Sequence, residues 1–124
     1  MQVSGMQFDR LPQPLRVALF AAATGLILYL SLAPAAAIPS VDLWDKAQHA
    51  LSFAGLTALG LGFWPGRWKA VAGLALGLGL AIEGLQANMG LGRHGDWRDV
   101  LADAVGVLVA LRLVQALRWV RRPR

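Results

Sequence analysis

The chain has 124 residues, of which 56% are hydrophobic and only 15% are charged, and its mean hydropathy is +0.51. A soluble domain of this size would not normally carry so few charges in such long apolar runs. The lack of cysteine excludes disulfides and thiolate metal sites. The net charge of +5 does not indicate a nucleic-acid partner, because the basic residues lie at the ends of apolar segments.

Four apolar segments follow one another along the chain, each close to the roughly 20 residues that span a bilayer. They cover residues 15–33, 46–64, 69–89 and 99–117. The first has some features of a signal peptide, but it is long for one, and three more apolar segments follow it. The sequence therefore predicts an all-α fold, an integral membrane bundle of four transmembrane helices.

Turn-forming residues separate these segments. Pro34 follows the first segment, and the tight turn Trp64-Pro65-Gly66 predicts an antiparallel hairpin between the second and third. We expect a tail of residues 1–14, a transmembrane domain of residues 15–118 and a basic tail of residues 119–124.

The distribution of lysine and arginine predicts the orientation. Four alternating spans place eight of the twelve basic residues on one side and three on the other, with Arg112 inside the fourth span. The first side holds Arg10, Arg16, Arg67, Lys69, Arg118, Arg121, Arg122 and Arg124, and the second holds Lys46, Arg93 and Arg98. Because cytoplasmic loops are rich in Lys and Arg, we expect a cell-membrane protein with both termini cytoplasmic.

The acidic residues gather on the opposite, outward side. Six of the seven lie in or beside apolar segments, namely Asp42, Asp45, Glu83, Asp96, Asp99 and Asp103. Charge placed against membrane-length apolar helices is expensive and is seldom present for stability alone. A polar site near one membrane face is therefore the main indication of function.

Helical spacing predicts that these groups face one another. Asp45 with His49, Glu83 with Gln86, and Asp99 with Asp103 are pairs at i, i+3 or i, i+4. Three helices would thus direct polar groups into one pocket in the outer third of the membrane. Glu83 lies several residues inside an apolar helix, so it must be paired, protonated or exposed to water. Its candidate partners are Lys46, His49 and Arg93.

Several motifs carry a family resemblance. They are Tyr29-Leu30-Ser31-Leu32, Asp45-Lys46-x-x-His49-x-x-x-Phe53, Glu83-x-x-Gln86, Arg93, and Asp96-x-x-Asp99-x-x-x-Asp103-x-x-Gly106. In order and spacing they resemble the VanZ-like family of small four-span membrane proteins, over nearly the whole chain after Leu15. One family member is linked to resistance to teicoplanin-type glycopeptides. The resemblance therefore implies that this chain affects susceptibility to such glycopeptides. The family usually has Asn at the position of Asp103, so this chain carries an extra carboxylate.

Our first hypothesis is a cell-envelope accessory or binding protein. Basic side chains would hold a phosphate or carboxylate of a lipid-linked envelope precursor or a glycopeptide, and carboxylates would orient them. The expected ligand-binding residues are Asp45, Lys46, His49, Glu83, Gln86, Arg93, Asp99 and Asp103, with Arg98 as a further basic group. Membrane lipids are expected partners, and we expect no cofactor and no nucleic acid.

Other hypotheses remain. An intramembrane enzyme acting on an envelope lipid would use His49 as general base or acid and Asp45 to orient it. Glu83 or Asp103 would supply a second carboxylate. A metal, if one binds, would take His49, Glu83, Asp99 and Asp103. The lack of a nucleophile motif and of a close histidine pair favours a non-enzymatic role. A purely structural bundle, with acidic groups complementing helix dipoles, and a proton or cation relay complete the alternatives.

Overall fold

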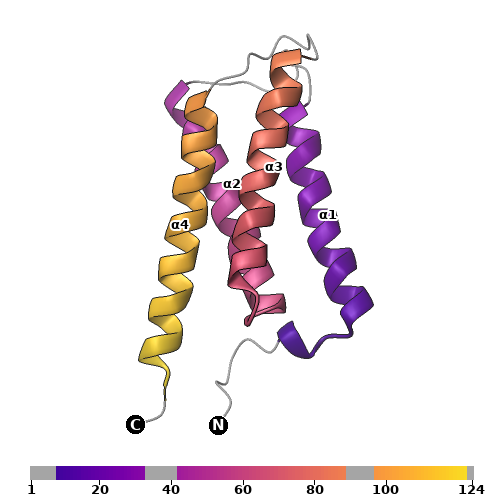
Figure 1. The fold of residues 1–124 in the computed structure, drawn as a ribbon, viewed down its shortest axis with the longest axis vertical. Coiled ribbons are helices and arrows are strands. Elements are labelled where there is room, and N and C mark those ends of the chain that lie inside the picture. Colours follow the sequence, from indigo (N-terminus) through magenta and orange to yellow (C-terminus); the bar gives the residue numbers. More distant parts are fainter. Residues whose placement is uncertain (1–7, 33–41, 89–96, 123–124) are drawn as a thin grey trace.

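A computed structural model describes residues 8–32, 42–88 and 97–122, with residues 42–45 described only as helix backbone. A short 3-10 turn, η1 (Phe8–Arg10), precedes four α-helices, which are α1 (Gln13–Leu32), α2 (Asp42–Phe63), α3 (Trp68–Asn88) and α4 (Trp97–Val120). The helices run side by side, each antiparallel to the next along the chain (Figure 1). The described residues contain no strand, which confirms the all-α prediction.

Three of the four helices are long and apolar enough to cross a membrane, namely α1, α3 and α4. α2 has 22 residues but does not reach the same apolar character over its described residues. The reason lies in its early turns, where Lys46, Gln48 and His49 interrupt the apolar sequence. Three of the four predicted spans are therefore candidate membrane-spanning helices by length and composition, which indicates a multi-pass membrane protein.

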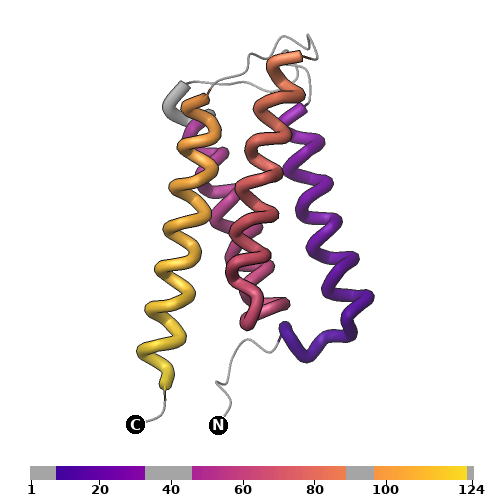
Figure 2. Tube along the Cα trace, in the orientation of Figure 1, coloured from indigo at the N-terminus to yellow at the C-terminus, as the bar shows by residue number. Residues whose placement is uncertain are grey.

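The up-and-down arrangement gives the bundle two chemically different ends. At the end that we call the basic end, α1 and α3 begin and α2 and α4 finish (Figure 2). Their positions relative to the helix bounds place Arg16, Arg67 and Arg118 at this end. At the other end, which we call the acidic end, α2 and α4 begin, and Asp99 and Asp103 occupy the first turns of α4. The charge separation expected from the sequence is thus reproduced by the fold.

α2 and α4 form the closest helix pair. Gly106 makes this possible, because a Cβ atom placed there would lie 2.1 Å from the carbonyl oxygen of Ala50. Small residues at helix crossings let backbones approach within van der Waals distance, which is how transmembrane helices associate when lipid removes the hydrophobic driving force. The neighbouring core is formed by Phe53, Ala72, Ala75, Ile82 and Val107.

Large apolar side chains cover the outside of the bundle. Leu26 of α1 is 58% exposed, Leu80 of α3 is 61% exposed and Leu113 of α4 is 59% exposed. α1 has no buried residue at all. A protein in water rarely exposes so much contiguous apolar surface, whereas lipid is a suitable solvent for it.

Two arginines complete the last turn of α2 at the basic end. Arg118 Nη2 donates to the Leu61 carbonyl oxygen at 2.8 Å, and Arg16 Nη1 donates to the Phe63 carbonyl oxygen at 2.7 Å. The Arg16 guanidinium also lies 5.8 Å from the centre of the Trp64 ring. The final carbonyls of a helix have no partner within the helix and carry its negative dipole end, so cationic donors stabilise them.

Arg118→Gln is expected to lower the free energy of unfolding by about 1.5–3 kcal/mol, the usual contribution of a hydrogen bond from a charged donor. The loss can be measured as a shift of the SDS-induced unfolding midpoint in mixed micelles. Arg121→Gln is the matched control, because it removes an exposed arginine from the same end of α4. Equal losses in the two variants would contradict the capping role of Arg118.

Candidate functional site at the acidic end

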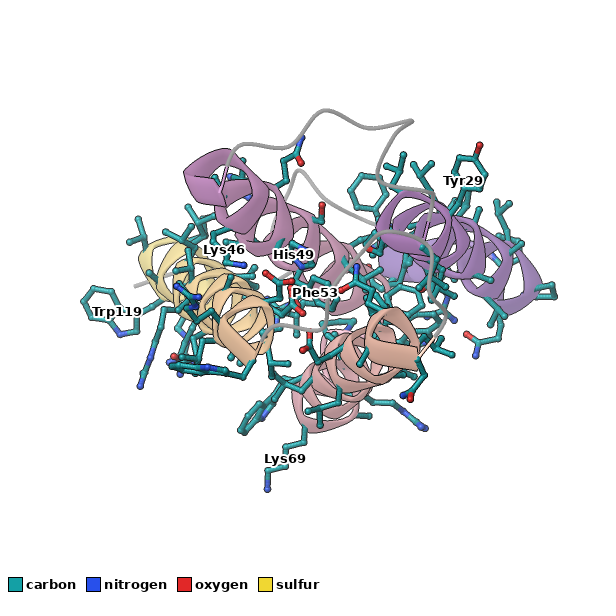
Figure 3. All side chains as sticks on the ribbon, turned by 90° about the horizontal axis from the view of Figure 1, so that it is seen from above. Tyr29, Lys46, His49, Phe53, Lys69 and Trp119 are labelled. Carbon is teal, nitrogen blue, oxygen red and sulfur yellow. The ribbon has the colours of Figure 1, made fainter. Side chains whose placement is uncertain are left out.

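Four ionisable side chains from α2 and α4 meet near the acidic end. Lys46 Nζ forms an ion pair with Asp99 Oδ1, and His49 Nδ1 lies 2.9 Å from Asp103 Oδ1. His49 Nε2 also lies 3.9 Å from Asp99 Oδ2. Seen from the acidic end, Lys46, His49 and Phe53 project from α2 toward the interior, whereas Tyr29 points away from the bundle (Figure 3). We call Lys46, His49, Asp99 and Asp103 the polar cluster.

Helical periodicity explains why these four side chains meet. Lys46 and His49 are three residues apart on α2, and Asp99 and Asp103 are four residues apart on α4, so each pair shares one helix face. Both helices begin at the acidic end, and their first turns therefore lie at matching depth. The close approach at Gly106, one turn below Asp103, brings the two faces into contact.

The polar cluster is largely shielded from its surroundings. Asp103 is 2% exposed, Asp99 6% and His49 9%, whereas the Lys46 side chain is 28% exposed. Burying these charges costs several kcal/mol for each ion, and the cost is offset only where opposite charges and hydrogen bonds meet in good geometry. Lys46 is therefore the member of the cluster that an external ligand reaches most easily.

α3 closes the third side of the polar cluster. A Cβ atom at Gly79 would lie 2.7 Å from Asp103 Oδ2, so this carboxylate lies against the α3 backbone. Glu83 lies one turn further along the same face of α3; it is half-buried, and its Oε2 atom is shielded from solvent. Asp103 thus belongs to the α3–α4 contact near the acidic end, and Glu83 lies one turn closer to that end on α3.

Gln86 makes a contact within the bundle. Its side chain is 4% exposed, and Nε2 donates to the Ser31 carbonyl oxygen at 2.7 Å. Ser31 lies in the last turn of α1, where carbonyls lack helical partners. Gln86 therefore joins α3 to the end of α1, and this contact does not include the polar cluster.

The structure brings together four of the predicted site residues and pairs them across two helices. We expected Asp45 to orient His49, and the structure places a further carboxylate, Asp103 of another helix, 2.9 Å from His49 Nδ1. The side chain of Asp45 and the whole of Arg93 lie outside the described residues. The contact between His49 and Asp103 could have been predicted from the depth of the two residues in the membrane. Two helices that begin at the same end of the bundle place their equivalent turns opposite each other.

The interaction that the polar cluster shows is charge pairing between α2 and α4. Within residues 8–32, 42–88 and 97–122, no three His, Cys, Asp or Glu side chains are grouped to hold a metal ion. A His–Asp pair can orient a general base, but both ring nitrogens of His49 lie near carboxylates of α4. The cluster is therefore built to hold charges in place between two helices.

Fold and site together define a small helical multi-pass membrane protein with a buried polar cluster at one end. No protein-family model matches the chain, and no curated protein or solved structure is significantly similar to it.

Proposed function

We propose that this chain is a four-span VanZ-like membrane protein of the cell envelope. In this proposal the acidic end faces outward, and the polar cluster binds the anionic part of a lipid-linked envelope precursor or a glycopeptide. By changing access to that molecule, the protein lowers susceptibility to teicoplanin-type drugs. The single observation that carries the proposal is the partly exposed Lys46 at the entrance of a buried network of opposite charges.

The packing of α2 supports the proposal that this helix is a membrane span in addition to α1, α3 and α4. α2 has 22 residues, enough to cross the hydrocarbon core, and it contacts α1, α3 and α4. Its polar side chains are directed at α4 and not at lipid, because Lys46 contacts Asp99 and His49 contacts Asp103. A span that hides its polar groups in this way needs less apolar character than one that faces lipid all round.

The polarity of the two ends supports the orientation. Arg16, Arg67 and Arg118 lie at the basic end, and an excess of Lys and Arg marks cytoplasmic segments. With the basic end in the cytoplasm, the polar cluster lies toward the outer leaflet. That is the leaflet at which glycopeptides act, as expected from the resemblance.

Lys46 supplies the binding chemistry in this proposal. Its ammonium group is held by Asp99 and remains 28% exposed, so an incoming phosphate or carboxylate can share it. Asp99, which is itself only 6% exposed, fixes the position of the ammonium group through this ion pair. Charge-assisted hydrogen bonds of this kind are about twice as strong as neutral ones.

A second candidate function rests on the same contacts. The pairing of Lys46 with Asp99 and of His49 with Asp103 also describes an electrostatic clamp between α2 and α4. In that case the cluster holds the bundle together and has no ligand. The two candidates differ in whether a stable but inactive variant exists.

A susceptibility assay tests the proposal. The wild-type chain, Lys46→Gln, Arg93→Gln and the basic-end control Lys69→Gln are expressed in a susceptible host at matched membrane levels, with an empty vector for comparison. We expect wild type and Lys69→Gln to raise the inhibitory concentration of teicoplanin, and Lys46→Gln and Arg93→Gln to return it to the vector level while the purified proteins keep their unfolding midpoints. No protection by wild type contradicts the resistance role. Loss of protection only together with loss of stability favours the clamp.

A further inference from the structure

A groove of about 420 Å³ lies at the basic end, on the side of the bundle formed by α4. Three arginines of α4 line it, namely Arg112, Arg118 and Arg122, together with Trp68 from the start of α3. We call it the α4 groove. It is separate from the polar cluster, which lies at the opposite end of the same helix.

The polarity of the α4 groove changes along the helix axis. Leu108 and Leu111 line the part that lies farther along the helix axis from the basic end. Arg118 and Arg122 line the part near the end of α4. Arg112 and Arg122 are ten residues apart, which corresponds to about 15 Å along a helix. An apolar section that leads into a basic section matches a phospholipid, whose acyl chain lies deeper in the membrane than its phosphate.

No acidic side chain among the described residues balances the charge of the α4 groove. No ion pair joins Arg112, Arg118 or Arg122 to an acidic side chain in the described part of the chain. Arg118 is occupied by the carbonyls of Leu61 and Pro65, which fixes its guanidinium at the base of the groove. Arg112 and Arg122 are exposed and have their guanidinium donors available.

Of the three arginines that line the α4 groove, Arg112 lies deepest in the apolar part of α4 and therefore gains most from a bound anion. It lies eight residues before the end of α4, about 12 Å from Val120 along the axis, within a helix apolar enough to cross a membrane. An arginine at such a depth is unfavourable unless its guanidinium extends to the interface or meets an opposite charge. A phosphate held in the groove provides that charge at the place where the side chain already extends.

We propose that the α4 groove binds the phosphate group of an anionic phospholipid of the leaflet at the basic end. Arg112 and Arg122 hold the phosphate oxygens, since a guanidinium offers two parallel donors that match them. Trp68, which is 50% exposed, lies beside the head group, where indole rings are favoured. The acyl chain covers Leu108 and Leu111. This inference does not depend on the function proposed for the acidic end.

Trp68 provides the reporter for the test. The full chain is reconstituted in phosphatidylcholine vesicles containing either brominated phosphatidylglycerol or brominated phosphatidylcholine at equal bromine content. Bromine quenches indole fluorescence on contact, and the difference between wild type and Trp68→Phe isolates the signal of Trp68 from those of the other tryptophans. The relative binding constant of the two lipids at Trp68 is the measured quantity.

We expect phosphatidylglycerol to be preferred at Trp68 by about 25-fold, because Arg112 and Arg122 each contribute about fivefold near a membrane surface. Arg122→Gln should lower the preference about fivefold, and Arg112→Gln with Arg122→Gln should abolish it. Arg121→Gln is the matched control, because it removes the adjacent arginine, which does not line the groove. Arg112→Lys, which keeps the charge, should retain part of the preference.

Three results would overturn the proposal. The first is equal quenching by the two lipids in wild type. The second is the same loss of preference in Arg121→Gln as in Arg122→Gln, which would indicate unspecific attraction of a basic surface. The third is displacement of the lipid preference by inorganic phosphate at constant ionic strength, which would indicate a site for the free ion. Circular dichroism and the unfolding midpoint of each variant establish that the compared proteins are folded.

Discussion

Gly106→Ala is expected to separate α2 from α4 and to lower the free energy of unfolding by about 3 kcal/mol, the upper end of the usual cost of overpacking. The added methyl would lie 2.1 Å from the Ala50 carbonyl oxygen and 3.0 Å from the Ala54 nitrogen. Both obstacles are backbone atoms, so no side chain can rotate away, and one helix must move. SDS-induced unfolding of the purified protein in mixed micelles measures the loss.

Gly77→Ala is the matched control for this prediction. It lies in the middle of α3, and a Cβ atom there meets nothing within 4 Å. Alanine is the better helix former by up to about 1 kcal/mol, so this variant should be as stable as wild type or more stable. If Gly106→Ala were equally well tolerated, the close α2–α4 contact would be contradicted.

The His49–Asp103 pair should show the second large effect. Asp103→Ala is expected to lower the free energy of unfolding by about 3–5 kcal/mol, the usual cost of leaving one member of a buried pair without its partner. His49→Ala should cost a similar amount. In the double variant the two losses of stability should not add, because the pair is already broken after the first substitution and the second removes no further contact between the two side chains. A coupling energy of about 1–3 kcal/mol is expected.

Asp103→Asn serves as the control for charge in this cycle. The amide oxygen can still accept from His49 Nδ1–H, so most of the stability should remain, whereas Asp103→Ala loses it. The comparison also bears on the VanZ-like resemblance, in which Asn is usual at this position. Additive effects of His49→Ala and Asp103→Ala, or equal losses for Asn and Ala, would show that the two side chains do not depend on each other.

These stability measurements also separate the two candidate functions. A clamp ties protection and stability together, since each substitution in the polar cluster loosens α2 from α4. A binding site allows Lys46→Gln to lose protection with little change in stability, because Lys46 is the most exposed member and the Gln amide can still donate to Asp99. Lys46→Gln is therefore the variant for which both quantities are most informative.

The sequence by itself determined the membrane class, the helices and the separation of charge. Apolar runs of membrane length are a property of local composition, and α1, α3 and α4 lie within two or three residues of their predicted bounds. The alternation of direction from helix to helix then places Arg16 and Arg118 at one end and Asp99 and Asp103 at the other. No knowledge of packing is required for these conclusions.

Only the tertiary structure decided which polar groups meet. Asp45 and Glu83 were as plausible as Asp103 for a contact with His49, because helical spacing defines a face but not its rotation toward a neighbour. The rotation of α4 against α2 is decided by Gly106, where the backbones come closest, and this contact turns Asp99 to Lys46 and Asp103 to His49. The close backbone contact at Gly106 thus determines which charges pair. Close packing depends on the position of each atom, whereas charge attraction acts over a longer range and does not by itself select one partner.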